Sequence, residues 1–575
     1  MEFSELIKTA TVEDVLLSRQ GLPDVRGTLC ITSHHLLLSS RPRGDLELWL
    51  LIRNVDAVEK RVCGSSGSIT LRCKDLKVLQ LEIPGTEECL NVASSIEALS
   101  SVDSVMMLYP FFHRPPSLRL RQGWHPCAPE RLFQQLAAQT SRWRLSAVNR
   151  DFSACPSYPP AVIVPAAVAD DTVAKAARFR QGGRFPVLSY FHAKNGTALL
   201  RSSQPLPGPK RRRCLEDEQL LGTVVAEGED NATTPLSPCR GRPLQESFAR
   251  LVEACGEPAP SVERWLGRLD SSRWLGHVKA ALSTACLAAQ CLDREGCSVL
   301  VHGAEGTDTT LLVTALAQLI LQPACRTLEG FQALLEREWI QVRVVFVMWR
   351  RVRVPAHLGA LTQPPHGQAG HPFQLRCARS AASPARGKRE APVFLLFLDC
   401  VWQLSRQFPF SLEFGEQLLL TLFDNAYASA YGTFLCNSEK ERRLCRLRER
   451  TPSLWARLEQ PEEKHKYLNP LYSHNPLPLW PCGQPQGIQL WHAIPVPERR
   501  AQLRPAPSLA GFFLRWIRPC RHLDEAWEEM RRLVQGDKSS LEEGEGKGRA
   551  GPSPRLGHGT HAETGTGQGP GVGLG

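Results

Sequence analysis

The chain lacks the cysteine spacings that mark metal sites and small disulfide scaffolds. Its 19 cysteines are odd in number, no two of them form a C-x-x-C pair, and they are scattered from Cys30 to Cys520. Zinc clusters and disulfide frameworks need cysteines or histidines at compact, recurring spacings. We therefore expect reduced thiols, no bound metal and no cofactor.

Two kinds of apolar segment are also missing. The N-terminal sequence MEFSELIKTATVEDV has no basic start followed by an apolar stretch, so we do not expect a signal peptide. No run of about 18 apolar residues occurs, and candidates such as residues 393–398 have the length of a core element. We expect a soluble cytosolic protein whose membrane contacts, if any, are peripheral.

Neither sign of charge dominates. Lysine and arginine number 69 against 58 acidic residues, and the net charge of +11 is small for 575 residues. This balance allows an anionic partner without requiring one, and we expect no nucleic acid. A composition that is 42% hydrophobic and 22% charged is globular, and the length exceeds a typical domain of about 100–150 residues. We expect two or more domains.

The first hundred residues have the pattern of a small β-barrel closed by a helix. Short apolar segments alternate with turn sequences such as RPRGD and GSSG. Strands are predicted over residues 27–32, 35–40, 47–52, 68–73 and 78–83, and a helix over residues 87–99. His34 and His35 fall between two of these strands, where we expect a turn or strand surface rather than a metal site.

The remainder of the chain predicts an α/β fold. FRQGGRFPVLSYFH (179–192) is typical of a loop entering a buried strand, and a strand over residues 298–301 runs into HGAEGTDTT and a helix. Helices are predicted over residues 261–269, 274–292, 310–321, 331–340 and 395–408. Irregular stretches are predicted over residues 222–242, 342–368 and 497–511, and the Gly-rich tail from residue 536 has the composition of a disordered segment.

The segment VLVHGAEGTDTTLL carries the strongest functional signal. A strand ends, a loop with two glycines follows, and Thr310 opens an apolar helix. Backbone N–H groups at a helix N-terminus attract anions. No lysine follows the second glycine, so this is not a nucleotide-binding P-loop. Most segments of this kind are ordinary turns, and the pattern alone does not decide.

This segment resembles VHCSDGWDRT, the phosphate-binding signature of the myotubularin-type phosphoinositide 3-phosphatases. Other blocks resemble the same family, namely RFPVLSY, WLGHVKAAL, EGFQALLEREW, HPF, APVFLLFLDCVWQLSRQFPFSLEF and YGTFLCNSE. The resemblance covers roughly residues 1–520. It implies a PH-GRAM-like domain over residues 1–105, a cysteine-phosphatase-like α/β domain over 106–520 with insertions at 342–368 and 497–511, a short coiled-coil-like helix over 521–535 and a disordered tail over 536–575.

The departures from the family signature point to a loss of catalysis. By the resemblance, Gly303 stands where active members have the nucleophilic Cys, and Thr309 stands where they have the phosphate-clamping Arg. Asp308 matches the acid catalyst and His302 the residue before the nucleophile. The resulting degenerate loop consists of His302, Gly303, Ala304, Glu305, Gly306, Thr307, Asp308 and Thr309. The resemblance therefore implies a pseudophosphatase with no catalytic residue in this loop.

Two other cysteines precede an arginine at the same spacing. They are Cys400, followed by Arg406, and Cys436, followed by Arg442. Neither segment has a glycine between the two residues, and both have helical or helix-entry patterns. Helical N–H groups are bonded to i−4 carbonyls and cannot surround a phosphate. We expect neither segment to be a site.

An apolar stripe near the C-terminus is a candidate partner-binding surface. Its members, at 4-3-4 spacing, are Leu523, Trp527, Met530 and Val534. This spacing begins a coiled-coil seam, but the pattern stops at Gly536, before the roughly three or four heptads of a stable coil. A short amphipathic helix that packs on its own domain remains the alternative.

The expected function is regulatory. The resemblance implies that the chain binds active myotubularin-related phosphatases as a heterodimer, or itself as a homodimer, and contacts phosphoinositide membranes. The implied location is cytoplasmic and peripheral on endosomal, endoplasmic-reticulum or perinuclear membranes. A PH-GRAM-mediated adaptor in endosomal trafficking or autophagy and a lipid phosphatase with unusual residues are the alternatives.

Overall fold

The structure is a computed structural model that describes residues 3–496 with several gaps. The residues outside the description are 1–2, 41–43, 121, 125–132, 135, 210–211, 226–240, 257–260, 341–369, 381, 384–389 and 497–575. The predicted insertions at 342–368 and 497–511, the helix over 521–535, the tail over 536–575 and the stripe of Leu523, Trp527, Met530 and Val534 all lie outside the described residues.

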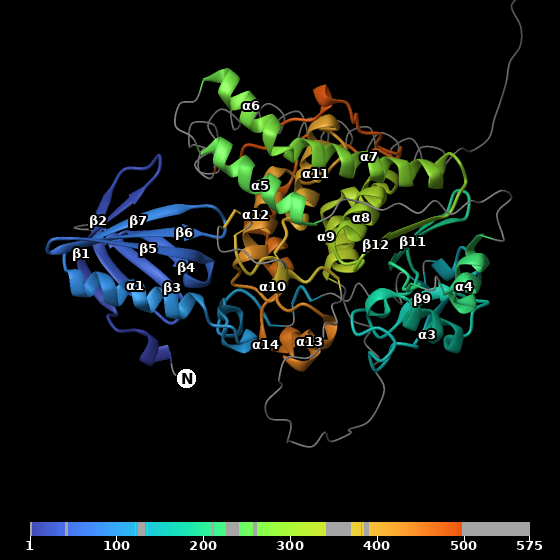
Figure 1. The fold of residues 1–575 in the computed structure, drawn as a ribbon, viewed down its shortest axis with the longest axis horizontal. Coiled ribbons are helices and arrows are strands. Elements are labelled where there is room, and N and C mark those ends of the chain that lie inside the picture. The colour runs from blue at the N-terminus through green and yellow to red at the C-terminus, as the bar shows by residue number, and fades with distance from the viewer. Residues whose placement is uncertain are drawn as a thin grey trace, which may run out of the picture. The chain divides into compact units, whose positions relative to one another are not determined.

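The N-terminal domain is a curled antiparallel sheet packed on one long helix (Figure 1). Its strands are β1 (Thr11–Arg19), β2 (Val25–Ile31), β3 (His35–Ser40), β4 (Leu46–Leu51), β5 (Val55–Cys63), β6 (Ser66–Cys73) and β7 (Val78–Ile83). They pair in the order β4-β3-β2-β1-β7-β6-β5. Helix α1 (Thr86–Ser100) buries Cys89, Val92 and Ile96 in the domain core. Burial of this apolar stripe stabilises the domain by roughly 0.8 kcal/mol per CH₂ group removed from water.

The predicted strands of this domain are confirmed, but two strands were missed. Strand β1 has a register shift between Val12 and Val15, and Asp14 there has a φ of 62°. A bulge of this kind breaks the period-2 alternation on which strand prediction depends. Strand β5 buries only its first residue, Val55, so it has no alternation at all.

The rest of the described chain is a mixed domain with short sheets and many helices. Strands β8 (Trp143–Ser146) and β9 (Val162–Pro165) form one antiparallel pair. Strand β11 (Thr197–Ser203) pairs antiparallel with β10 (Val187–His192) and parallel with β12 (Val299–Gly303). The helices are α3 (Asp170–Phe179), α4 (Leu215–Val225), α5 (Gly241–Cys255), α6 (Val262–Ser272), α7 (Trp274–Asp293), α8 (Thr309–Leu321), α9 (Leu328–Leu335), α10 (Phe373–Arg376), α11 (Val393–Gln407), α12 (Glu416–Tyr427), α13 (Glu439–Leu444), α14 (Leu447–Arg450), α15 (Leu454–Leu458) and α16 (Pro461–Tyr467).

Helix α8 is the centre of this domain's core. All but the first of its residues are buried, and it packs against α7 and α11 as well as on β11 and β12 (Figure 1). A helix that is apolar on every side is stable only when it is enclosed. The enclosed α8 therefore holds the loop at its N-terminus in a rigid frame.

Most predicted helices are confirmed, with two corrections. The predicted helix over residues 331–340 is α9 followed by a π-helical turn over Glu336–Ile340. The stretch 222–242 was expected to be irregular, but its first residues finish α4 and its last two begin α5. Leu220 and Val224 are buried four residues apart, which ties the end of α4 to the core.

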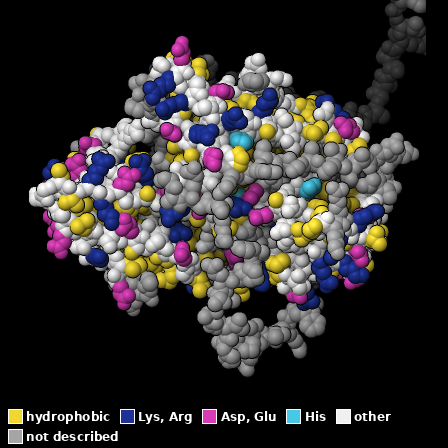
Figure 2. Space-filling view, viewed as in Figure 1, with side chains coloured by type: hydrophobic (Ala, Val, Ile, Leu, Met, Phe, Trp, Pro, Cys, Tyr) yellow, Lys and Arg dark blue, Asp and Glu magenta, His cyan; other side chains and the backbone are white. Residues whose placement is uncertain are grey.

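Two kinds of feature are absent from the described residues. No helix described here is long and apolar enough to cross a membrane. Within the same residues, no group of three or more His, Cys, Asp and Glu side chains is arranged to hold a metal ion. Basic and acidic side chains are interspersed on the face shown in Figure 2.

Candidate functional site

The degenerate loop lies between the carboxyl end of β12 and the N-terminus of α8. The parallel pairing of β11 with β12 ends at Ser203 and Gly303, so the loop starts where the sheet stops. Gly306 has a φ of 70°, and a Cβ at this residue would lie 2.6 Å from the Ser202 carbonyl oxygen. Only glycine fits such a close approach in this conformation. The predicted strand–loop–helix order is confirmed, with Thr309 as the first residue of α8.

Gly303 leaves no side chain at the position where the resemblance places a nucleophile. A Cβ built there would lie 2.9 Å from Oγ1 of Thr310 and 3.9 Å from the backbone nitrogen of Gly306. The Thr310 side chain is buried, and its hydroxyl has no hydrogen-bond partner among the described residues. The threonine hydroxyl therefore borders the space that a cysteine side chain would enter.

Asp308 is held by two side chains from a distant segment. Nη2 of Arg376 lies 2.7 Å from Oδ2 of Asp308, and Nε of Arg376 lies 3.1 Å from Oδ1. Nδ1 of the buried His371 lies 3.1 Å from Oδ1 and 3.3 Å from the Thr307 carbonyl oxygen. Both neighbours of Nδ1 are acceptors, so this nitrogen carries the proton.

These contacts keep Asp308 ionised. Burial alone would raise the pKa of Asp308, but the hydrogen bond from His371 and the charge of Arg376 hold the pKa well below its usual range. A carboxylate in this state accepts hydrogen bonds and carries no proton at neutral pH. A general acid works best with a pKa near the working pH, and these contacts move the pKa of Asp308 away from that range.

The basic groups around the loop are already engaged. Arg376 also contacts Glu305, with Nη2 and Oε2 separated by 3.1 Å. The buried Arg184 donates from Nη2 to the Gly306 carbonyl oxygen at 2.8 Å and from Nη1 to Ser157 at 3.0 Å. An incoming anion would therefore compete with two carboxylates for Arg376.

The roles of Arg184, His371 and Arg376 were missed from sequence. Arg184 and His371 lie within the blocks RFPVLSY and HPF, which carry the family resemblance. The resemblance singled out these two blocks but did not indicate that either of them lies beside the loop. Arg376 follows HPF by three residues and had no signal of its own.

Comparison of the sequence with known proteins places the chain in one family. The profile "Myotubularin-like phosphatase domain" matches residues 108–239, 230–357 and 360–443, and the profile "MTMR6-9, GRAM domain" matches residues 11–100. The chain is 54% identical to "Myotubularin-related protein 9-like" of Bos taurus over 570 residues, which are 93% of this chain and 96% of that protein. The chain belongs to the myotubularin-related family.

Two further myotubularin-related proteins show the range of its relatives. "Myotubularin-related protein 9" of Homo sapiens is 48% identical over 568 residues, covering 94% of this chain and 95% of that protein. "Phosphatidylinositol-3-phosphate phosphatase MTMR7" of Homo sapiens is 32% identical over 526 residues, covering 83% of this chain and 75% of that protein. This myotubularin-related chain thus has relatives named as phosphatases.

The two alternative cysteines lie in the helical settings predicted for them. Cys400 is buried inside α11. Cys436 lies two residues before Ser438, the N-cap of α13, and Arg442 within α13 donates to the carbonyl oxygens of Leu435 and Ile340. The Arg442 guanidinium therefore binds backbone carbonyl oxygens of its own domain.

The expectation for the adjacent histidines was wrong for His35. His35 begins β3 and is 8% exposed, with its ring centroid 4.3 Å from that of Tyr109 and 5.1 Å from that of Trp49. Burial, with smaller effects of the charges of His34 and His113, lowers the pKa of His35 to about 4. Aromatic packing between distant segments, which local sequence does not reveal, placed this histidine in the interior.

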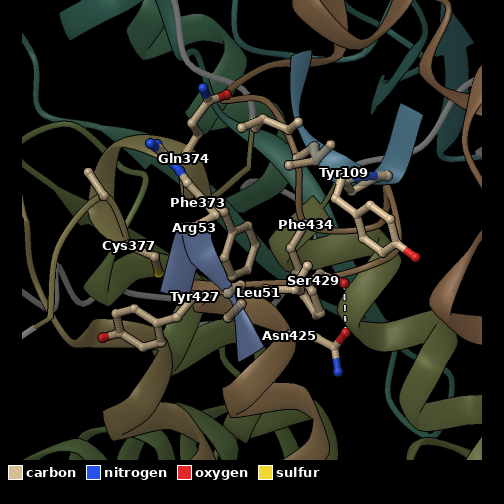
Figure 3. Close-up of a pocket in the computed structure, with 16 residues that line it drawn as sticks. Leu51, Arg53, Tyr109, Phe373, Gln374, Cys377, Asn425, Tyr427, Ser429 and Phe434 are labelled. Atoms are coloured by element: carbon tan, nitrogen blue, oxygen red, sulfur yellow. Dashed lines mark hydrogen bonds between the residues drawn. The ribbon is translucent and has the colours of Figure 1, made fainter. Parts of the chain in front are cut away.

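A small crevice of about 60 Å³ lies beside Tyr109 (Figure 3). Most of its lining is apolar and includes Leu51, Phe373 and Phe434. Arg53 reaches its wall, but Nη1 of this arginine donates to the carbonyl oxygens of Ser100 and Val102. Gln374, Asn425 and Ser429 also line the crevice, and the Ser429 hydroxyl donates to Oδ1 of Asn425 at 2.6 Å.

Proposed function

We propose that this chain is a catalytically inactive pseudophosphatase that binds an active myotubularin-related phosphoinositide 3-phosphatase and stabilises, stimulates or localises it. The observation that carries the proposal is glycine at position 303, at the carboxyl end of β12. Hydrolysis through a phospho-enzyme needs a thiolate to attack phosphorus. Glycine has no side chain with which to attack.

Two neighbouring positions support the same conclusion. Thr309 offers one neutral hydroxyl where the family's arginine offers five donors and a positive charge. Asp308 is ion-paired with Arg376 and has no proton for a leaving group. The loop thus keeps a strand–loop–helix backbone without the nucleophile, the clamp or the acid.

The packing of the domain supports the regulatory part of the proposal. The core around α7, α8 and α11 is extensive and buried, and a folded but unreactive domain can still present binding surfaces. We assign partner contact to the stripe of Leu523, Trp527, Met530 and Val534. A homodimer is the alternative assembly. Peripheral attachment to endosomal, endoplasmic-reticulum or perinuclear membranes belongs to the same proposal.

Native isolation of the tagged full chain from cells tests this function. We expect a myotubularin-related phosphatase to co-purify and phosphatidylinositol 3-phosphate hydrolysis to accompany it. The chain purified alone should release no phosphate. Hydrolysis by the chain alone would refute its inactivity, and an isolate without any such phosphatase would refute the regulatory role.

A second candidate function, a membrane-surface adaptor, is supported by one end of the PH-GRAM sheet. Leu22 and Leu46 are 45% and 52% exposed. The Arg19 guanidinium donates to the Glu47 carbonyl oxygen at 2.9 Å, which brings the end of β1 close to the start of β4. Exposed leucines at one edge can enter a lipid surface.

Substitution of both leucines tests the adaptor. The Leu22→Asp/Leu46→Asp variant should lose binding to vesicles that contain phosphatidylinositol 3-phosphate, because two charges would have to enter the interface. Leu90→Asp on α1 is the control, since Leu90 is similarly exposed at 44%. Equal vesicle binding by all three proteins would exclude this function.

A further inference from the structure

Three histidines gather around Tyr109, in the segment that follows the PH-GRAM domain. The ring centroid of Tyr109 lies 4.3 Å from that of His35, 5.4 Å from that of His34 and 5.1 Å from that of His113. His34 directly precedes β3 and His35 begins it, whereas Tyr109 and His113 bound residues 109–113, here called the linker segment. These ring contacts hold the linker segment on the PH-GRAM sheet.

The linker segment also contacts the phosphatase-like domain. The Phe112 ring centroid lies 4.9 Å from that of His34 on the PH-GRAM side. The Tyr109 hydroxyl lies 3.0 Å from Nδ1 of His113, and the His113 ring centroid lies 5.6 Å from that of Tyr431 in the phosphatase-like domain. The linker segment therefore connects the two domains through a continuous cluster of aromatic and histidine rings.

The neutral form of His35 is the form that fits this cluster. The side chain is buried, and its Nε2 has no hydrogen-bond partner among the described residues. Both ring nitrogens of an imidazolium carry protons, so protonation would leave a charged, buried N–H group at Nε2 without an acceptor. Burying a charge without a partner is costly. The pKa of His35, about 4, agrees with this geometry, and burial also lowers the pKa of His34 and of His113.

Cations face the cluster from several elements, and they disfavour further positive charge on its rings. Arg53 lines a cavity of about 20 Å³ that His34 also borders. Arg114 directly follows the linker segment, and the guanidinium carbon of Arg450 on α14 lies 5.1 Å from the ring centroid of Phe111. Besides burial, the charges of Arg114 and of Arg457 on α15 lower the pKa of the linker histidine, His113.

The carboxylates near the cluster do not compensate for these cations. On the elements around the cluster they are Glu5, Glu47, Asp103, Glu449 and Glu463. Glu47, Glu449 and Glu463 already pair with arginines, and Glu5 and Asp103 are exposed to water. Among the described residues, none of the three histidine rings forms an ion pair with a carboxylate. Protons taken up by the cluster would therefore stay uncompensated.

We propose that His35 is the acid-sensitive member of a latch, which holds the linker segment on the PH-GRAM sheet while the ring is neutral and releases it when the ring takes up a proton. Tyr109 is the linker residue that the latch holds. Its ring borders both the crevice of about 60 Å³ and the cavity of about 20 Å³ (Figure 3). Because contacts are missing on these sides, less packing opposes release. The proposal is independent of the proposed function, since it concerns the joint between the domains and not the degenerate loop.

The direction of the pH effect follows from the lowered pKa of His35. Once the linker segment is released, the ring meets water and its pKa returns towards about 6.5. The released state then binds the proton more tightly than the latched state does, so acid favours release. Between about pH 7.5 and pH 5.5, His35 alone should raise the equilibrium constant for release by about tenfold.

Hydrogen exchange of the full chain, followed by mass spectrometry, tests the latch. The backbone nitrogens of Phe112 and His113 donate to the Tyr109 carbonyl oxygen at 2.8 and 2.9 Å, so these amides exchange when the linker segment opens. After correction for the intrinsic pH dependence of exchange, their protection should fall by about tenfold between about pH 7.5 and pH 5.5. Peptides from α8 should stay protected.

Either of two results with the unmodified chain would overturn the proposal. One is unchanged protection of the linker segment at the lower pH. The other is an equal loss of protection in α8, because acid would then unfold the whole domain and not open a local latch.

His35→Phe separates protonation from packing, because phenylalanine keeps an aromatic ring without a nitrogen that titrates. This variant should keep most of the protection of its linker segment at the lower pH. His474→Phe is the matched control, since His474 is exposed in the phosphatase-like domain, and it should lose protection as the unmodified chain does. An undiminished loss in His35→Phe would overturn the proposal. If His35→Phe does not fold, the measurements on the unmodified chain still decide.

Discussion

Arg376 forms a two-point ion pair with Asp308, with distances of 2.7 and 3.1 Å from its Nη2 and Nε to the two carboxylate oxygens. The two residues are 68 positions apart in the chain. In a charge-assisted pair of this geometry both partners are restrained. The aspartate that the resemblance assigns to acid catalysis is therefore a structural anchor of the loop.

The first prediction concerns catalysis. The unmodified chain should release no phosphate from phosphatidylinositol 3-phosphate, and Gly303→Cys and Thr309→Arg should each stay within about twofold of background, because groups that act as a unit are not additive. The double variant should show the largest signal of the set. Phosphate release by the unmodified chain above a heat-killed control would contradict inactivity.

The second prediction concerns residual anion binding. The N-terminus of α8 and the loop backbone should bind inositol phosphates weakly and with strong salt dependence. Glu305 and Asp308 compete for Arg376, so Glu305→Gln should tighten binding by about twofold to fivefold. Loop amide shifts in NMR titrations at low salt measure the change.

A matched control accompanies this titration. Glu295 is exposed and lies before β12, so Glu295→Gln removes the same charge away from Arg376. It should leave the affinity unchanged. If no shift occurs at millimolar ligand in any of these proteins, the loop is purely structural.

The third prediction concerns stability and pH. Asp308→Asn should lower the free energy of unfolding by about 2–4 kcal/mol at pH 7, because a partly buried Arg376 loses its partner. The folded-state pKa of Asp308 lies below its unfolded value of about 3.9, so the ion pair stabilises the fold above that value. The difference in unfolding free energy between the unmodified chain and Asp308→Asn should therefore shrink as the pH falls from about 5 towards 3.

Urea unfolding at a series of pH values measures this difference. Glu305→Gln is the comparison, because Glu305 is 58% exposed and its pair should contribute less than about 1 kcal/mol. Two results would show that Asp308 is not anchored by charge. One is an equal loss of unfolding free energy in Asp308→Asn and Glu305→Gln. The other is a difference between Asp308→Asn and the unmodified chain that does not change with pH.

The fourth prediction concerns the partner surface. Four apolar residues in the stripe of Leu523, Trp527, Met530 and Val534 could contribute roughly 6–12 kcal/mol gross, against an association cost of about 4–15 kcal/mol. Leu523→Asp/Met530→Asp should therefore abolish co-purification with an active myotubularin-related phosphatase and any stimulation of it.

Substitutions between the apolar positions provide the control for this surface. Glu525→Gln and Arg532→Gln should leave association unchanged, because both lie off the apolar stripe. If the double Asp variant co-purifies as well as the unmodified chain does, the interface lies elsewhere in the protein.

Sequence patterns predicted much of the fold. Apolar residues at helical spacing predicted α7, α8 and α11 within one or two residues at most ends, because each helix buries a continuous face. Strands β1 and β5 escaped prediction, since a bulge and a largely exposed strand remove the alternation. Asp170–Phe179, or α3, was also missed, although its acidic first turn is a helix-start signal.

The sequence by itself determined which chemical groups the loop has. No fold can supply a thiol at Gly303 or a guanidinium at Thr309, because backbone geometry does not create side chains. Only the tertiary structure decided what surrounds the groups that remain. Arg184 reaches the Gly306 carbonyl from 122 residues away, and Arg376 reaches Asp308 from 68. Such contacts depend on how α8 and the sheet pack, which no local pattern of residues specifies.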